Sequence, residues 1–255
     1  MIDVHSHILW DLDDGARTFD DSMAMLRMAA QTGTTDIVAT PHANSQFAFR
    51  PEAVEEKLSL LRESTAGLIR IHSGCDFHLH YDNIQDALAN PAKYTIAHRS
   101  YLLVEFSEMF VARQIDAVVS KMLAAGIVPI ITHPERNLAL QQRLGDLSRW
   151  VKEGCLVQVT AQSLLGRFGS KSQRFAELLL KKNLVHVIAS DAHDSTDRPP
   201  RLDLAYAYIA ENYNPELARR LFVENPAKVL EGGPIYVDVL EPGQGHDTRR
   251  RWFRW

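Results

Sequence analysis

Histidines and acidic residues follow short apolar runs of this sequence at the points where the runs end. The stretch IASDAH closes one run with Asp191 and His193, and the N-terminal stretch MIDVHSHIL leads into His5 and His7. Imidazole and carboxylate groups without thiolate ligands suit divalent ions such as Mn, Fe, Zn or Mg. These residue types therefore predict a metal site.

Other apolar runs end in the same way. The further candidate ligands are His42 in ATPHA, Asp76 in HSGCDFH, Glu105, His133 in ITHPER and, as an additional acid, Asp14. A single histidine after a strand is usually structural. Histidines and acidic residues at the same position of several β-α units, however, are unlikely to occur by chance. Because the set exceeds the needs of one ion, we expect two or three ions that share a bridging carboxylate. Such ions activate water as a hydroxide nucleophile and neutralise phosphoryl charge.

The runs that carry these residues read as strands of a parallel sheet. They are near-continuously apolar, as in IVPIIT and YLLVEF, which is typical of strands buried on both faces. The expected strands cover residues 2–4, 36–40, 68–72, 101–106, 127–132, 156–160 and 184–189. Seven β-α units predict an α/β fold with a parallel sheet, and seven or eight such units usually close into a barrel whose carboxyl strand ends build the active site.

Amphipathic stretches separate the expected strands. Their apolar stripes predict five helices. The stripes are Met23, Leu26 and Ala30, then Val54, Leu58 and Leu61 after Pro51, then Ile115, Val119 and Met122, then a weaker stretch at 144–151, and finally Phe175, Leu178 and Leu179. We expect residues 1–235 to form one catalytic domain and residues 236–255 to form a separate tail.

Composition narrows the class of protein. The chain has 255 residues, 45% of them hydrophobic, and a formal net charge of −4. An acidic balance argues against nucleic acid as a partner. No apolar run reaches the ~18 residues of a membrane span, and the N-terminus shows no signal peptide. The two cysteines do not suggest a disulfide scaffold, so we expect a cytoplasmic protein.

The sequence also argues against other phosphatase chemistries. Neither Cys75 nor Cys155 is followed by an arginine six residues later, which the cysteine-loop phosphatases require, and no G-x-S-x-G elbow is present. The stretch GRFGSKS at 166–172 resembles a phosphate loop but lacks its spacing. A metal centre therefore remains the best candidate for the reactive group.

Five motifs together resemble a known family. HSH at 5–7, DDG at 13–15, ATPH at 39–42, HPER at 133–136 and SDAH…RPP at 190–200 are similar to the PHP (polymerase and histidinol phosphatase) superfamily. The resemblance is closest to its capsule and exopolysaccharide tyrosine-phosphatase branch, the CpsB/YwqE type, and extends to about residue 235. It implies a distorted TIM-like (β/α)7 barrel of the PHP type with a trinuclear cluster, usually of manganese or iron. The implied substrate is the tyrosine-rich tail of a membrane tyrosine autokinase.

The resemblance also implies roles for individual residues. The implied ligands are His5, His7, Asp14, His42, Asp76, Glu105, His133, Asp191 and His193. Arg136 and Arg198 match arginines that hold phosphate, a role that suits a guanidinium fork. Asp191, or a nearby histidine, is a candidate proton donor to the leaving phenolate. One departure is Asp76, which stands where the family usually has glutamate and is one methylene shorter.

Several alternatives stay open at this point. A small-molecule phosphatase acting on histidinol phosphate or a nucleotide would use the same metal centre, and an amidohydrolase or a non-catalytic PHP-like metal-binding module are further alternatives. We expect His78 and His80 to lie on the rim of the site and His186 to pack in the barrel wall. The tail RRRWFRW favours a frayed end or an oligomer contact over a membrane or partner contact.

Overall fold

All paired strands in the part of the chain that the structure describes run parallel. The computed structural model describes residues 1–107, 111–112 and 114–236. The strands are β1 (Ile2–Ser6), β2 (Asp36–Ala39), β3 (His42–Ala43), β4 (Arg70–Ser73), β5 (Asp76–His78), β6 (Tyr101–Glu105), β7 (Val128–Thr132), β8 (Leu156–Thr160) and β9 (Val187–Ala189). They form two parallel sheets, in the orders β1-β2-β4 and β3-β5-β6-β7-β8-β9.

The two sheets are continuous around a ring. β2 leads into β3 through Pro41, and β4 leads into β5 through Gly74, where a Cβ would come within 2.8 Å of a Val38 methyl carbon. At the other junction, the amide of Asp191 donates to the carbonyl of His5 (2.9 Å), and the amide of His7 donates to the carbonyl of Ala192 (2.8 Å). Strands therefore lie in all seven predicted places, and the distorted TIM-like barrel is confirmed.

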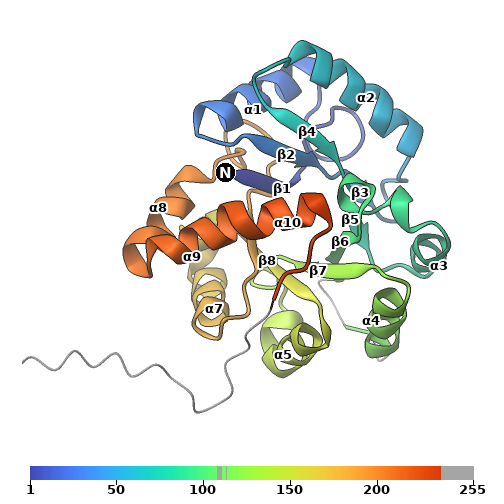
Figure 1. Cartoon of the computed structure of the whole chain (residues 1–255), viewed down its shortest axis with the longest axis vertical. Coiled ribbons are helices and arrows are strands. Elements are labelled where there is room, and N and C mark those ends of the chain that lie inside the picture. The colour runs from blue at the N-terminus through green and yellow to red at the C-terminus, as the bar shows by residue number, and fades with distance from the viewer. Residues whose placement is uncertain (108–110, 113, 237–255) are drawn as a thin grey trace, which may run out of the picture.

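Helices surround this ring (Figure 1). The helices are α1 (Phe19–Gln31), α2 (Pro51–Ser64), α3 (Tyr81–Ala89), α4 (Ile115–Ala124), α5 (Leu144–Glu153), α6 (Ala161–Leu164), α7 (Gly169–Lys181), α8 (Asp203–Asn212), α9 (Pro215–Arg219) and α10 (Asn225–Glu231). Each of the five predicted helices is present. The face predicted for α7 is partly wrong, because Ala176, Leu179 and Leu180 are buried whereas Phe175 and Leu178 are only partly so.

Apolar side chains fill one end of the barrel, and the candidate site residues lie at the other end. Val4, Leu103 and Val187 belong to an apolar cluster that also contains Val229 of α10. Figure 1 shows α10 crossing the strands at that end. Because the strands run parallel, the residues that follow them meet at the opposite, carboxyl end of the barrel.

None of the helices described is long and apolar enough to cross a membrane. The described chain ends at Tyr236, so the basic and aromatic tail lies outside the described residues. The division into a domain over residues 1–235 and a tail after it therefore stays a prediction.

Candidate metal centre

The predicted candidates come together at the carboxyl ends of the strands. His5, Asp76 and Glu105 lie within β1, β5 and β6, and the others lie at the start of β3 or in the loops that follow β1, β7 and β9. Four overlapping groups have ligand atoms within 4.8 Å of one another. They are His7–Asp14–His42–His193, His5–His7–Asp76, His42–His78–Glu105 and Asp76–Glu105–His133.

The tautomers of three histidines direct Nε2 lone pairs into the centre. The Nδ1 atoms of His5, His7 and His193 lie 3.0, 2.6 and 3.0 Å from oxygen acceptors on Gln158, Asp13 and the Asp191 backbone. Each Nδ1 therefore carries the proton and donates it, as in metal-binding histidines. The Nε2 atoms of His5 and His7 then face each other at 3.3 Å. A positive charge between these two atoms, either a shared proton or a metal ion, removes the repulsion of the facing lone pairs.

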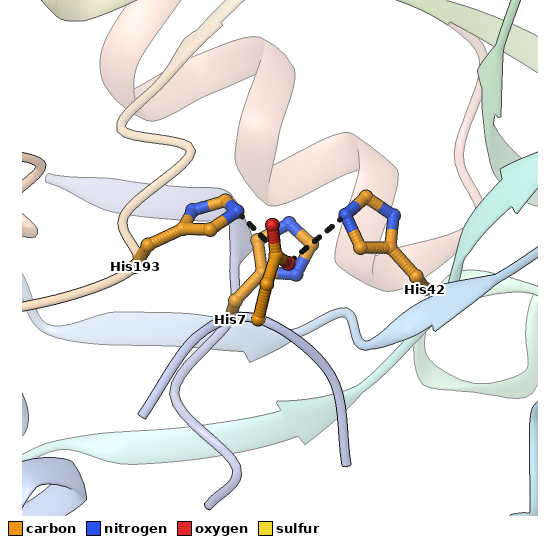
Figure 2. A group of neighbouring side chains, drawn as sticks. His7, His42 and His193 are labelled. Atoms are coloured by element: carbon orange, nitrogen blue, oxygen red, sulfur yellow. Dashed lines mark ion pairs between the residues drawn. The ribbon is translucent and has the colours of Figure 1, made fainter. Parts of the chain in front are cut away.

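Figure 2 shows how one of the groups is assembled. The rings of His7, His42 and His193 come from three separate segments, and Asp14 lies 3.4 Å from Nε2 of both His42 and His193. Its side chain is 54% exposed, so this group forms the solvent-facing edge of the centre. The Cβ atom that any other residue would place at Gly15 would lie 2.2 Å from the His7 carbonyl oxygen. Glycine is therefore required for this loop to approach His7.

Carboxylate oxygens at the centre lack well-directed hydrogen-bond donors. Both Asp76 oxygens and Glu105 Oε2 are buried and accept no hydrogen bond of good geometry from the described residues, although imidazole nitrogens lie beside Asp76 Oδ2 and Glu105 Oε2 at ion-pair distance. Such groups are costly to bury unless they are compensated. Asp76 Oδ2 lies 3.5 Å from His5 Nε2 and 3.1 Å from His42 Nδ1. A carboxylate between two imidazole groups in this way suits a bridging ligand, and the donor set as a whole fits divalent ions.

The electrostatics at the centre favour added positive charge. Burial and then the charge of Asp76 raise the pKa of Glu105. Burial opposes protonation of His7, but the Asp13 carboxylate outweighs it and raises the pKa of His7 to about 9. Burial, followed by the Arg136 charge, lowers the pKa of His133 to about 3. His133 is thus neutral and able to bind a metal, whereas the acids elsewhere attract a cation.

Asp191 joins the metal centre to two arginines. Its Oδ1 lies 3.5 Å from Nε2 of both His5 and His7, and its Oδ2 contacts Arg136 and Arg198, the latter at 2.7 Å. Burial opposes ionisation, but His5 and the other neighbours hold the pKa of Asp191 well below its usual range. A carboxylate that stays ionised does not donate a proton at neutral pH, so the geometry favours a ligand role over the proton-donor role.

The loops that carry the arginines are firmly anchored. Glu135 Oε1 accepts from the Thr160 amide (3.0 Å) and the Ser163 hydroxyl (2.7 Å), which holds the loop after β7 against α6. Asp194 Oδ1 accepts from the amides of Thr196 and Asp197, and this turn presents Arg198.

Phe168 supports both arginine side chains. Its ring centroid lies 4.3 Å from the Arg136 guanidinium carbon and 6.0 Å from that of Arg198. Phe168 belongs to the GRFGSKS stretch, so this segment contributes an aromatic platform under the guanidinium groups rather than a phosphate loop.

Two strained backbones occur at the candidate ligands. His133 and Asp191 have φ angles of 33° and 53°, in the left-handed region that few residues other than glycine adopt. Both directly follow or closely follow a strand, and this conformation turns the chain sharply there. Local strain of this kind persists where the surrounding structure holds it, as at functional sites.

Asp13, Gln158 and His78 take part in the centre although the sequence reasoning missed them or assigned them elsewhere. Asp13 Oδ2 contacts the His7 ring and accepts from the His42 amide at 3.1 Å, and Gln158 orients His5. The signal for Asp13 was its place beside Asp14 in DDG. His78 was expected on the rim, but its Nε2 lies 2.5 Å from Glu105 Oε2. The equal strand parity of Asp76 and His78 was the signal for His78.

Replacement of His78 should therefore weaken metal binding. We expect His78→Ala to lower metal affinity about tenfold or more, as loss of a residue that supports a ligand does. His78→Gln keeps a polar group near Glu105 and should lose less. Competition with a chromogenic chelator measures the affinity. The control is His98→Ala, because His98 is an exposed histidine that pairs with Glu55. Equal affinities of His78→Ala and the parent protein would place His78 outside the centre.

Both cysteines are unsuited to act as nucleophiles. Cys75 and Cys155 are free and buried. Burial raises the pKa of Cys155 to about 12 and the pKa of Cys75 well above its usual range. Because the thiolate is the nucleophile, the structure agrees with the missing cysteine-loop motif.

Together, the parallel barrel and the histidine- and carboxylate-rich cluster at its carboxyl end define a barrel hydrolase with a candidate metal centre. Residues 1–231 match the family described as "Capsular polysaccharide synthesis, CpsB/CapC". The chain belongs to this family.

Named relatives agree with this assignment. The chain is 36% identical to the putative tyrosine-protein phosphatase CapC of Staphylococcus aureus, over 78% of this chain and 79% of that protein. It is 34% identical to the tyrosine-protein phosphatase CpsB of Streptococcus pneumoniae, over 90% and 98% of the two chains.

A solved structure reported for YwqE from Bacillus subtilis and CpsB from S. pneumoniae, described as unique metal-dependent tyrosine phosphatases, matches with a TM-score of 0.86. The identity is 29%, over 95% of this chain and all of that one. The family resemblance drawn from the five motifs is therefore confirmed.

Proposed function

We propose that this protein is a metal-dependent phosphotyrosine phosphatase whose site hydrolyses the phosphate ester without a protein nucleophile. The observation that carries the proposal is the arrangement around Asp191. One of its oxygens faces the Nε2 atoms of His5 and His7, and the other contacts Arg136 and Arg198. A cluster that favours cations thus lies beside two guanidinium groups that suit phosphate.

The proposed ligands are the residues gathered at the carboxyl ends of the strands. They are His5, His7, Asp14, His42, Asp76, Glu105, His133, Asp191 and His193. The overlap of four groups through shared members supports two or three ions, and the nitrogen and oxygen donors support manganese or iron. Divalent ions held there would activate water for attack at neutral pH and neutralise charge on the phosphoryl group.

The chain's own groups would position the phosphate. Arg136 and Arg198 share Asp191 Oδ2 in the structure, and non-bridging phosphate oxygens would compete with this carboxylate for the same donors. The Phe168 ring lies near both guanidinium groups and so limits where they can move. A phenolate is a fair leaving group, so the site needs no strong protein acid near the ester oxygen.

The proposed substrate is phosphotyrosine on a tyrosine autokinase of capsule or exopolysaccharide synthesis. The names of the relatives and of the family support this substrate class.

A metal add-back assay tests the proposal. EDTA-stripped protein should be inactive and should regain activity on a phosphotyrosine peptide with Mn²⁺ or Fe²⁺, with lower activity on histidinol phosphate and a nucleotide monophosphate. Iodoacetamide should leave the rate unchanged because both thiols are buried. Activity confined to the small phosphates would replace the proposal with a small-molecule phosphatase. Full activity of the stripped protein would refute the metal requirement.

A further inference from the structure

An apolar pocket lies behind the arginine loop, outside the metal centre. It has a volume of about 520 Å³ and lies between the segment after α6, the loop that carries Arg198, and α8. Its lining includes Leu165, Leu204, Ala207 and Tyr208, and none of these belongs to the candidate metal cluster. A pocket of this size takes one or two amino-acid side chains.

Helix α8 presents two apolar faces, and only one of them is buried. Ala205 and Ile209 pack into the core. Leu204, Ala207 and Tyr208 stand three or four residues apart on another face, and this face lines the pocket. Leu204 is 53% exposed and Leu165, across the pocket, is 37% exposed. A second apolar face that the fold itself leaves uncovered is typical of a binding surface.

Two walls of the pocket are built by chain neighbours of the groups proposed to hold phosphate. Arg167 on one wall directly precedes Phe168, the platform under both arginines, and Pro199 on another wall directly follows Arg198. The amide of the Gln162 side chain donates to the Asp197 carbonyl at 3.1 Å, so the two walls are joined. Because the lining residues are chain neighbours of Phe168 and Arg198, a peptide whose phosphate reaches Arg198 would have its flanking residues within reach of this pocket.

The charges around the pocket leave its apolar surface as the main recognition element. Arg201 is paired with Asp203 through two contacts, at 3.1 and 2.6 Å. The Tyr208 hydroxyl donates a hydrogen bond to Glu177 at 2.9 Å, so it needs no further partner in the pocket. Arg167 and Glu211 are exposed and of opposite charge.

We propose that this pocket binds an apolar side chain of the residues that flank phosphotyrosine in the peptide substrate. The inference rests on the proposed function and adds to it a preference for protein substrates with apolar neighbours of the phosphotyrosine. The metal centre and the arginines recognise the phosphate, and the pocket recognises the polypeptide that carries it.

The test compares substrates with and without flanking residues on the metal-loaded full chain. The substrates are a phosphotyrosine peptide with leucine at the two positions on each side, the same peptide with glycine there, and p-nitrophenyl phosphate. We expect the leucine peptide to have a KM about tenfold below that of the glycine peptide, the discrimination typical of an apolar pocket. Leu204→Glu should abolish this preference, and Leu165→Gln on the opposite wall should do the same.

Leu60→Glu is the matched control, since Leu60 is 45% exposed on the outer side of α2. It should retain the preference for leucine. Equal KM values of the parent protein for the two peptides would refute the pocket's role. The same conclusion would follow if both pocket variants changed KM by the same factor for the peptides and for p-nitrophenyl phosphate. Either result would leave the phosphatase activity in place. Absence of hydrolysis of every phosphotyrosine compound would instead overturn the proposed function and, with it, this inference.

Discussion

Replacement of His133 by alanine is expected to lower kcat/KM for a phosphotyrosine peptide on the order of a thousandfold or more. His133 Nε2 lies 3.7 Å from Glu105 Oε1, and the residue is a member of the Asp76–Glu105–His133 group. Burial and the Arg136 charge lower its pKa to about 3, so the ring is a neutral donor. Its loss would remove one of the proposed metal ligands. The measurements are kcat/KM and metal content by mass spectrometry.

The fold should survive this change. His133 follows β7 at the open end of the barrel, so its removal leaves the apolar clusters intact. His186→Ala serves as the control, because it should lower the stability of the fold and leave the metal content unchanged. His186 is also buried, but its Nδ1 accepts from the Val157 amide at 3.0 Å, in the barrel wall. Loss of that bond should destabilise the fold by about 1–3 kcal/mol while metal content is kept. Full activity and unchanged metal content in His133→Ala would contradict the assignment.

Removal of either arginine guanidinium is expected to lower kcat/KM by about a hundredfold to a thousandfold, as with other preorganised donors. Metal content should stay unchanged, because Arg136 and Arg198 contact the oxygen of Asp191 that faces away from His5 and His7. Lysine should not restore activity, since an ammonium group cannot form two parallel hydrogen bonds to phosphate.

The two arginines should also act as a unit. They share Asp191 Oδ2 and the Phe168 ring, so the double variant should lose less than the product of the single losses. Inhibition by inorganic phosphate reports binding directly and should weaken in both single variants. Arg149→Ala removes a guanidinium that pairs with Asp116 and Asp146 and should change neither activity nor inhibition. A fall in metal content that parallels the fall in activity would show that the arginines act through Asp191 rather than on phosphate.

The strand pattern and most of the site could be predicted from the sequence because they depend on local periodicity. Near-continuous apolar runs followed by His, Asp or Glu recur along the chain, and parallel strands bring their carboxyl ends to one side. The predicted candidates accordingly meet at that side. The partly wrong face of α7 shows the limit of this reasoning. An apolar residue such as Leu178 fits the helical period equally well whether the neighbouring element covers it or not.

The sequence alone determined the barrel class, the residues proposed to carry the chemistry and the lack of a suitable cysteine motif. Only the tertiary structure decided which of the two ring nitrogens of His5 and of His7 faces the metal centre. His5 Nδ1 contacts Gln158, which is far away in the chain, and His7 Nδ1 contacts Asp13, which lies across a turn. These contacts set the direction of the Nε2 lone pairs. The place of His78 beside Glu105 and the uncovered face of α8 are likewise products of packing. Periodicity reports which face of an element is apolar, whereas side-chain partners depend on distances that are set when the ring of strands closes.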